Sequence, residues 1–176
     1  PEWGNVRNQT PSPSTIQDAI DKECDDALVE GDPHITTFDD LLYTTLSMGE
    51  FVLLSSDVDD FEIQMRTAPT DAGDSLACRN VTSAAAFAVL MNGVRVAFYN
   101  DQANAVVIDG ETHALEPGVP IMLPNDVGFV ANYKNRLSYV LFADGSVLTV
   151  RSVGGWLQGR AIIQSERLGT VSGLWG

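Results

Sequence analysis

Short runs of alternating hydrophobic and polar residues, separated by Asx-Gly pairs, dominate the chain from Gly31 onward. In the clearest run, residues 61–66, every second residue is hydrophobic, the period of a strand whose side chains point alternately to opposite faces. Asx-Gly pairs adopt the positive φ angles that tight hairpin turns need. Three such pairs occur: Asn92-Gly93, Asp109-Gly110 and Asp144-Gly145. We therefore expect an all-β fold, a two-layer antiparallel β-sandwich of many short strands.

The turns and the hydrophobic runs together define the expected strands. These are residues 61–66, 84–91, 94–99, 106–108, 112–115, 119–123, 127–133, 137–142, 147–151 and 161–164. In the first strand, Phe61, Ile63 and Met65 should face the core. The alanine run 84–86 is compatible with a helix by itself, but its position before an Asn-Gly turn favours a strand. The pair Gly154-Gly155 indicates a bulge or a tight bend before Trp156.

The first 28 residues follow a different pattern. Prolines at positions 1, 11 and 13 indicate an extended arm. Ser14 and Gln17 then have the spacing of a helix capping box. Hydrophobic residues follow at helical intervals, namely Ile16, Ala19, Ile20, Ala27 and Leu28. We therefore expect a short N-terminal helix, and divide the chain into an arm with this helix (residues 1–28) and a β domain (residues 29–176).

Length and charge narrow the class of protein. The chain has 176 residues, 44% of them hydrophobic, enough for one domain with a real core. Its formal net charge of −14 argues against binding to nucleic acid or to an anionic membrane surface, and an acidic solvated coat is the plainer interpretation. No apolar run is long enough to predict a transmembrane segment. Neither a signal peptide nor an initiator methionine is visible, so we interpret the chain as a mature or excised piece of a larger protein.

One peptide bond has intrinsic chemistry. In Gly31-Asp32-Pro33-His34, the Asp32 carboxylate can attack its own carbonyl carbon and close a five-membered anhydride. Pro33 is a favourable leaving group because its nitrogen belongs to a tertiary amide, and His34 can move protons near neutral pH. The alternative is structural: Asp32 caps a turn, Pro33 rigidifies the start of a strand, and His34 donates a hydrogen bond. The structural interpretation is favoured because reactivity depends on geometry that a motif does not fix.

The same stretch carries a family resemblance. GDPHITTFD, residues 31–39, resembles the opening signature of the von Willebrand factor type D domain, an extracellular β-sheet module. The resemblance continues through GEFVLL (49–54), FEIQMR (61–66), the run 81–89 and VSGLWG (171–176), and so covers about residues 29 to 176. Gly49 and Trp175 stand where many members have cysteine, so the chain resembles a cysteine-poor branch. The resemblance implies a secreted or cell-surface location.

The two cysteines, Cys24 and Cys78, allow either a disulfide across a long loop or two buried thiols. The resemblance to a secreted module favours the disulfide. Two glycosylation sequons start at Asn8 and Asn80 and would make the protein a glycoprotein if it passes through a glycosylating pathway. Asn8 is the better candidate because the prolines after it keep its surroundings extended.

The resemblance also implies a possible calcium site. Asp39 stands where the family supplies a carboxylate ligand, and the other ligands resemble a loop that would follow Gly176. The set is incomplete in this chain because calcium takes six to eight oxygen ligands. Asp40 replaces the usual glycine after this aspartate, which puts the loop geometry in doubt. A second acidic cluster, Asp57, Asp59 and Asp60, is interpreted as a solvated turn.

Enzyme motifs are sparse. The chain has two histidines, His34 and His113, and none of the common zinc, nucleotide or hydrolase signatures. His113 is expected on a strand surface. Glu50 and Glu62 have no visible partner, so a pair of glycosidase carboxylates is unsupported. The three tryptophans are more often packing residues than a sugar-stacking surface; they are Trp3, Trp156 and Trp175.

The leading hypothesis is therefore a non-catalytic extracellular structural module for adhesion or assembly. Its partners would be other proteins, copies of itself or neighbouring domains of a larger chain, and it would need no cofactor except possible calcium. The alternative is a self-processing domain that cleaves its own Asp32–Pro33 bond and forms a crosslink through Asp32. A weaker third hypothesis is glycan recognition by the tryptophans.

Overall fold

The computed structural model describes residues 26–70, 81–102, 104–134 and 137–176. Several predictions from the sequence lie outside these residues. They concern the disulfide between Cys24 and Cys78, the sequons at Asn8 and Asn80, Trp3, and the N-terminal arm and helix as far as residue 25.

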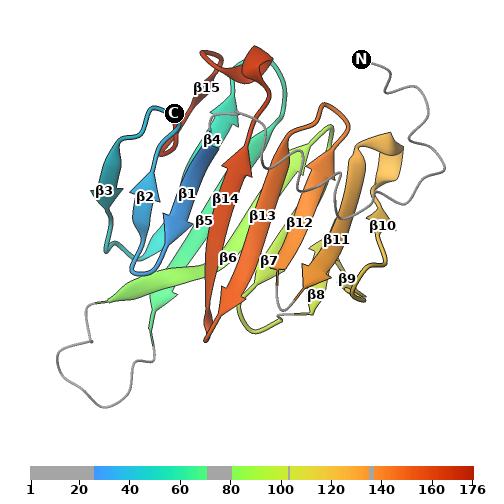
Figure 1. The fold of residues 1–176 in the computed structure, drawn as a ribbon, viewed down its shortest axis with the longest axis horizontal. Helices are drawn as coiled ribbons and strands as arrows, with labels where there is room; N and C mark the ends of the chain where they lie inside the picture. Colours follow the sequence, from blue (N-terminus) through green and yellow to red (C-terminus); the bar gives the residue numbers. More distant parts are fainter. Residues whose placement is uncertain (1–25, 71–80, 103, 135–136) are drawn as a thin grey trace.

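Two antiparallel sheets form a β-sandwich, as the turn and alternation pattern predicted (Figure 1). The eight-stranded sheet has the order β10 (Ile121–Met122), β11 (Gly128–Lys134), β12 (Leu137–Phe142), β13 (Val147–Val153), β14 (Trp156–Ile162), β1 (Asp26–Glu30), β2 (His34–Thr36) and β3 (Leu42–Thr44). The seven-stranded sheet has the order β15 (Val171–Ser172), β4 (Gly49–Ser56), β5 (Glu62–Pro69), β6 (Thr82–Met91), β7 (Val94–Tyr99), β8 (Ala105–Ile108) and β9 (Glu111–Ala114). Two short 3-10 helices, η3 (Pro124–Asp126) and η4 (Ser165–Arg167), lie in the connections.

The Asx-Gly pairs form the predicted hairpin turns. Asn92 and Asp109 have positive φ angles of 50° and 48°, and the glycine after each is also in the left-handed region. These turns connect β6 to β7 and β8 to β9, and the Asp144-Gly145 turn connects β12 to β13. The Gly154-Gly155 pair likewise forms a tight turn, between β13 and β14.

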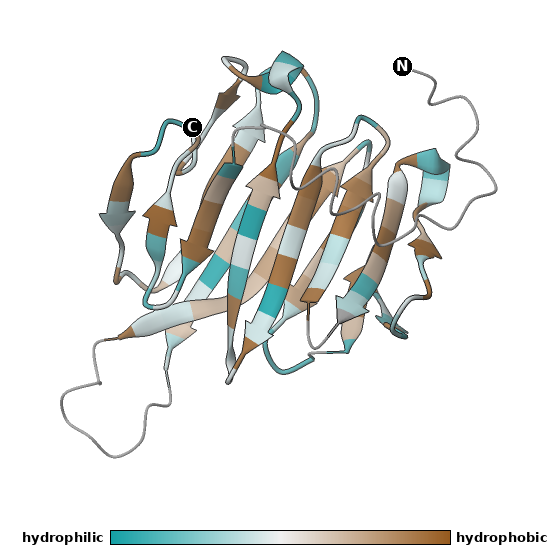
Figure 2. Ribbon diagram, in the orientation of Figure 1, coloured by the Kyte–Doolittle hydropathy of each residue, from teal (hydrophilic) through white to brown (hydrophobic). Residues whose placement is uncertain are grey.

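Alternation along the strands separates the core from the surface. On β5, Ile63 and Met65 are buried, while Gln64 and Arg66 are exposed, and Phe61 is buried just before the strand. The alternating bands of hydrophobic and hydrophilic residues are visible along the strands of the eight-stranded sheet (Figure 2). The core is therefore a layer between the two sheets, as expected for a sandwich.

The start of the domain differs from the prediction. Ala27 and Leu28 were expected on a helix, but they lie on β1, which pairs with β14 on one side and β2 on the other. The reason is burial: Ala27 and Val29 are both fully buried, and two inward residues with period two dominate over a weak helical spacing. Strand β1 also crosses the boundary that the sequence placed between residues 28 and 29.

Strand β14 begins earlier than expected. The sequence predicted residues 161–164, whereas β14 spans Trp156–Ile162. Polar residues and Gly159 interrupt its hydrophobic pattern. Gly159 is required by packing, because a Cβ there would lie 2.5 Å from two atoms of the Phe87 ring on the opposite sheet. Gly159 therefore lets Phe87, fully buried, fill the middle of the sandwich.

Three of the sequence blocks that carry the family resemblance lie in contact with one another in the structure. Trp175 is fully buried and donates its backbone N–H to Leu53 of β4 at 2.8 Å, while its carbonyl accepts from the Phe38 N–H at 3.0 Å. The rings of Phe38 and Trp175 pack edge to face with centroids 6.4 Å apart. The Tyr43 hydroxyl donates to the Leu174 carbonyl at 2.6 Å. Trp175 is thus a packing residue that joins GDPHITTFD, GEFVLL and GLWG.

Candidate functional site

The Gly31–Pro33 turn lies between β1 and β2 at one end of the eight-stranded sheet. Gly31 has a φ of 65°, which favours glycine in this tight turn. The Asp32 side chain is 52% exposed, whereas Pro33 is buried. The described residues contain no cis peptide bond, so the Asp32–Pro33 bond is trans. The Asp32 carboxylate therefore faces solvent, and the Pro33 ring is packed into the domain.

Edge strand β3 and the residue after it position this turn. The Thr45 N–H donates to the Pro33 carbonyl at 3.1 Å. His34 Nδ1 lies 2.8 Å from the Thr44 hydroxyl, and its Nε2 lies 4.0 Å from an Asp32 carboxylate oxygen. His34 therefore shares a hydrogen bond with Thr44, in which either group can be the donor, and Thr44 orients the ring toward Asp32. Within the described residues, the Asp32 side chain contacts His34.

A groove of 540 Å³ lies beside Asp32. Its walls come from both sheets: the Gly31–Asp32 turn, the end of β5, the start of β6, Asn100 after β7, and the β13–β14 turn with Trp156. The lining residues are Gly31, Asp32, Ala68, Pro69, Thr70, Val81, Ser83, Asn100, Gly154, Gly155 and Trp156. Asn100 Nδ2 donates to the Gly155 carbonyl at 2.8 Å and so ties the two sheets together at this end. The groove thus joins Asp32 with Trp156 and the diglycine, which the sequence treated separately.

Asp39 does not complete a calcium cage. Its carboxylate accepts a hydrogen bond from the Thr37 hydroxyl, and Asp40 beside it has a φ of 63°. Among the described residues, no group of three or more His, Cys, Asp or Glu side chains lies close enough to hold a metal ion. These residues therefore do not fit a calcium ion by themselves.

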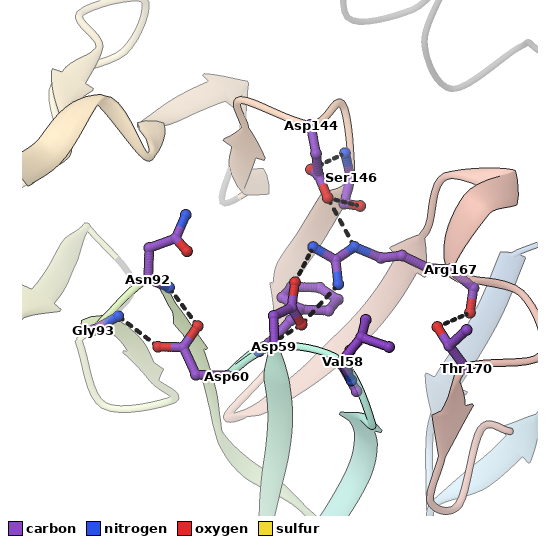
Figure 3. Close-up of polar contacts among 11 residues, drawn as sticks. Val58, Asp59, Asp60, Asn92, Gly93, Asp144, Ser146, Arg167 and Thr170 are labelled. Carbon is purple, nitrogen blue, oxygen red and sulfur yellow. Dashed lines mark hydrogen bonds and ion pairs between the residues drawn. The ribbon is translucent and has the colours of Figure 1, made fainter.

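The acidic cluster after β4 is an exposed bend, as the sequence predicted, and two of its carboxylates also bind partners in other loops (Figure 3). The Asp60 carboxylate accepts the backbone N–H groups of Asn92 and Gly93, both at 2.6 Å, and so fixes the β6–β7 turn. Asp59 pairs with Arg167 of η4 at 2.9 Å. Both partners are far away in sequence, and local spacing contains no signal for them.

Arg167 connects the β4–β5 loop of the seven-stranded sheet with the β12–β13 turn of the eight-stranded sheet. Its guanidinium also pairs with Asp144 of the β12–β13 turn at 2.8 Å and lies 4.5 Å from the centroid of the Phe61 ring. The Arg167 side chain is only 11% exposed. Hydrogen bonding to Arg167 lowers the pKa of Asp59 to about 2. We call Arg167, Asp59 and Asp144 the arginine clamp; its groups are mutually satisfied, which indicates a structural role.

The remaining candidate residues are separated from the groove. His113 lies on β9 and is half-buried, opposite Val106. Glu50, which had no visible partner in the sequence, pairs with Arg66 at 2.6 Å on the outer surface of the seven-stranded sheet. These side chains make no catalytic arrangement with Asp32.

A surface feature that sequence reasoning missed is a set of exposed hydrophobic side chains around edge strand β3. We call this set the β3 patch; it consists of Leu41, Leu42, Leu46, Met48 and Val52. Leu42 is 69% exposed. The hydrophobic residues between the opening motif and β4 can be seen in the sequence. Only the topology shows that β3 is at the sheet edge.

No family model matches the chain. Within the described residues, no helix is long and apolar enough to cross a membrane.

Proposed function

We propose that the protein is a non-catalytic extracellular module, similar to von Willebrand factor type D domains, that serves adhesion or assembly by binding other proteins. The β3 patch is the observation that carries this proposal. An edge strand offers unpaired backbone groups to an added strand, and exposed hydrophobic side chains such as Leu42 favour contact with another protein. The contacts of Trp175 with Phe38 and Leu53 join the three motif blocks in one packing unit.

A photo-crosslinking experiment tests the assembly role. Benzoyl-phenylalanine replaces Leu46, which is 52% exposed, in the protein produced by its natural host. Val119, 51% exposed and on the connection before β10, is the matched control position. We expect a discrete crosslinked product, identified by mass spectrometry as a specific protein or a second copy, from position 46 and none from position 119. No product at position 46, or equal products at both, would contradict the proposal.

A second candidate function is self-processing at Asp32–Pro33, which the exposed carboxylate and the neighbouring His34 favour. In this reaction an Asp32 side-chain oxygen attacks the Asp32 carbonyl carbon, and the C–N bond to Pro33 breaks. Protonated His34 gives its proton to the departing Pro33 nitrogen. Water, or a hydroxyl group of a second molecule, then opens the anhydride and leaves an acid or an ester at Asp32.

Intact-mass analysis distinguishes the two functions. The purified chain is incubated at mildly acidic pH beside Asp32→Ala. Fragments ending at Asp32 and starting at Pro33, absent from the variant, would support self-processing. A single unchanged mass would leave assembly as the function of the domain. His34→Gln serves as a further test, since it should slow fragment formation without abolishing it if His34 is the proton donor.

A further inference from the structure

The groove beside Asp32 has the chemistry of a small-molecule site. Its lining includes Trp156, Asp32 and Asn100, together with Thr70 and Ser83. Pockets of about 300 to 1,000 Å³ that pair an apolar surface with a few polar groups are typical of ligand sites. At 540 Å³, the groove lies within this range.

We propose that this groove binds a neutral saccharide. A pyranose ring has one face of C–H groups and an edge of hydroxyl groups. The indole of Trp156 offers a flat apolar surface for the C–H face. Carboxylate and amide groups accept and donate hydrogen bonds to hydroxyl groups, and Asp32 and Asn100 lie in the same lining. The ligand class therefore follows from one aromatic ring combined with short polar side chains.

The charges of the described lining residues favour an uncharged ligand. Among the described lining residues, none is Lys, Arg or His, and Asp32 is the one ionisable group. An anionic sugar would face the Asp32 carboxylate without a cationic partner. A cation would find a single carboxylate, fewer ligands than calcium takes.

The site is also preformed. The diglycine turn that carries Trp156 is held by Asn100 from the other sheet, at 2.8 Å. On the opposite wall, the Thr70 N–H and hydroxyl group both lie 3.1 Å from the Val81 carbonyl and donate to it. Within the described residues, a Cβ at Gly154 or Gly155 would meet no atom within 4 Å outside its neighbours in the chain. Rigid walls reduce the entropy that binding costs.

A glycan array tests the proposal with the purified chain. The array contains neutral hexose and N-acetylhexosamine oligosaccharides beside sialylated and sulfated chains of matched length. We expect saturable binding to neutral members only. Trp156→Ala should weaken binding by about tenfold, the effect of losing one aromatic stacking contact. Tyr99→Ala, an aromatic substitution outside the groove lining, should leave binding unchanged and is the matched control.

A second measurement on the unchanged protein avoids dependence on the folding of a variant. In a two-dimensional amide NMR titration with the best neutral disaccharide, the signals of Gly154, Gly155 and Asn100 should shift most. Absence of binding to every neutral glycan would overturn the proposal, as would shifts centred elsewhere or equal losses in Trp156→Ala and Tyr99→Ala. The proposal stands apart from cleavage and from assembly, because Trp156→Ala changes neither the Asp32–Pro33 bond nor the β3 patch.

Discussion

The two ends of the sandwich both carry aspartates, but these side chains are paired at one end and half-exposed at the other. At one end, Asp59 and Asp144 are paired with Arg167, and Asp60 binds two backbone amides. At the other end, Asp32 is half-exposed, its neighbour His34 lies 4.0 Å away, and a groove opens beside it. The strands between them run from one end to the other (Figure 1).

This difference separates stability from function. A carboxylate whose partners are all within the protein stabilises the fold, whereas an exposed one with open space beside it is available to a ligand or a reaction. The acidic residues of the clamp end therefore carry structure, and Asp32 carries the candidate chemistry. Substitutions at the two ends should have very different effects on the free energy of unfolding.

The largest effect should come from Arg167→Met. Removing the guanidinium leaves Asp59 and Asp144 facing each other without a cation, and we expect a loss of about 3 kcal/mol in unfolding free energy. Urea denaturation followed by fluorescence measures it. Arg160→Met is the control, because Arg160 pairs with Asp26 through side chains that are 38% and 39% exposed. The control should lose less than about 1 kcal/mol; equal losses would contradict the structural role of the clamp.

The middle of the sandwich should be the next most sensitive region. Gly159→Ala places a methyl group against the Phe87 ring, and overpacking of this kind costs about 2 kcal/mol. The same denaturation assay applies. The added methyl group clashes with the Phe87 ring. The double variant Gly159→Ala with Phe87→Leu should therefore lose less stability than the sum of the two single changes. Additive losses would show that the sheets do not meet at this pair.

The clamp should also make stability depend on acid. The folded-state pKa of Asp59 is lowered from 3.8 to about 2, so its contribution is present above about pH 4 and is lost as the pH falls toward 2. Since the Asp59 side chain is 33% exposed, solvent screening reduces this contribution to about 1 kcal/mol. Unfolding free energies of the wild type and Asp59→Asn should therefore converge over this window. A constant difference from pH 5 to 2 would contradict the assignment.

The smallest effect should come from Asp32→Asn at the open end. The carboxylate contacts His34 at 4.0 Å and is mostly hydrated, so we expect a change of less than about 0.5 kcal/mol at neutral pH. The same change would block anhydride formation if cleavage occurs. A loss comparable to that of Arg167→Met would mean that both ends are structural, and the contrast between them would fail.

The sandwich could be predicted because its signals are local. The Asx-Gly turns and the alternation beside them placed Val94–Tyr99 and Leu137–Phe142 with the observed bounds. Where a strand is short and buried, as at β1, its hydrophobic residues Ala27 and Leu28 also fitted a helix. Glycines selected by packing across the sandwich, such as Gly159, cannot be distinguished in a sequence from glycines that end strands.

The candidate site could be predicted only in part. The sequence indicated the Asp32–Pro33 turn, and its neighbour His34 shares a hydrogen bond with Thr44. It did not indicate that Trp156 shares a groove with Asp32, or that Asp59 reaches Arg167. Those pairs are more than one hundred residues apart and meet only after both sheets have formed. The disulfide, the sequons, calcium binding and the extracellular location stay predictions.

The packing of Trp175 has a mechanical consequence. The indole N–H donates to the Leu28 carbonyl of the first strand at 3.4 Å, while the backbone around it bonds to Phe38 and Leu53. Tension applied at residue 176 would therefore load these few contacts before the long ladders in the interior. Loss of the Trp175 contacts would release the segment that carries this residue at low force, while the other strands of the sandwich stay paired.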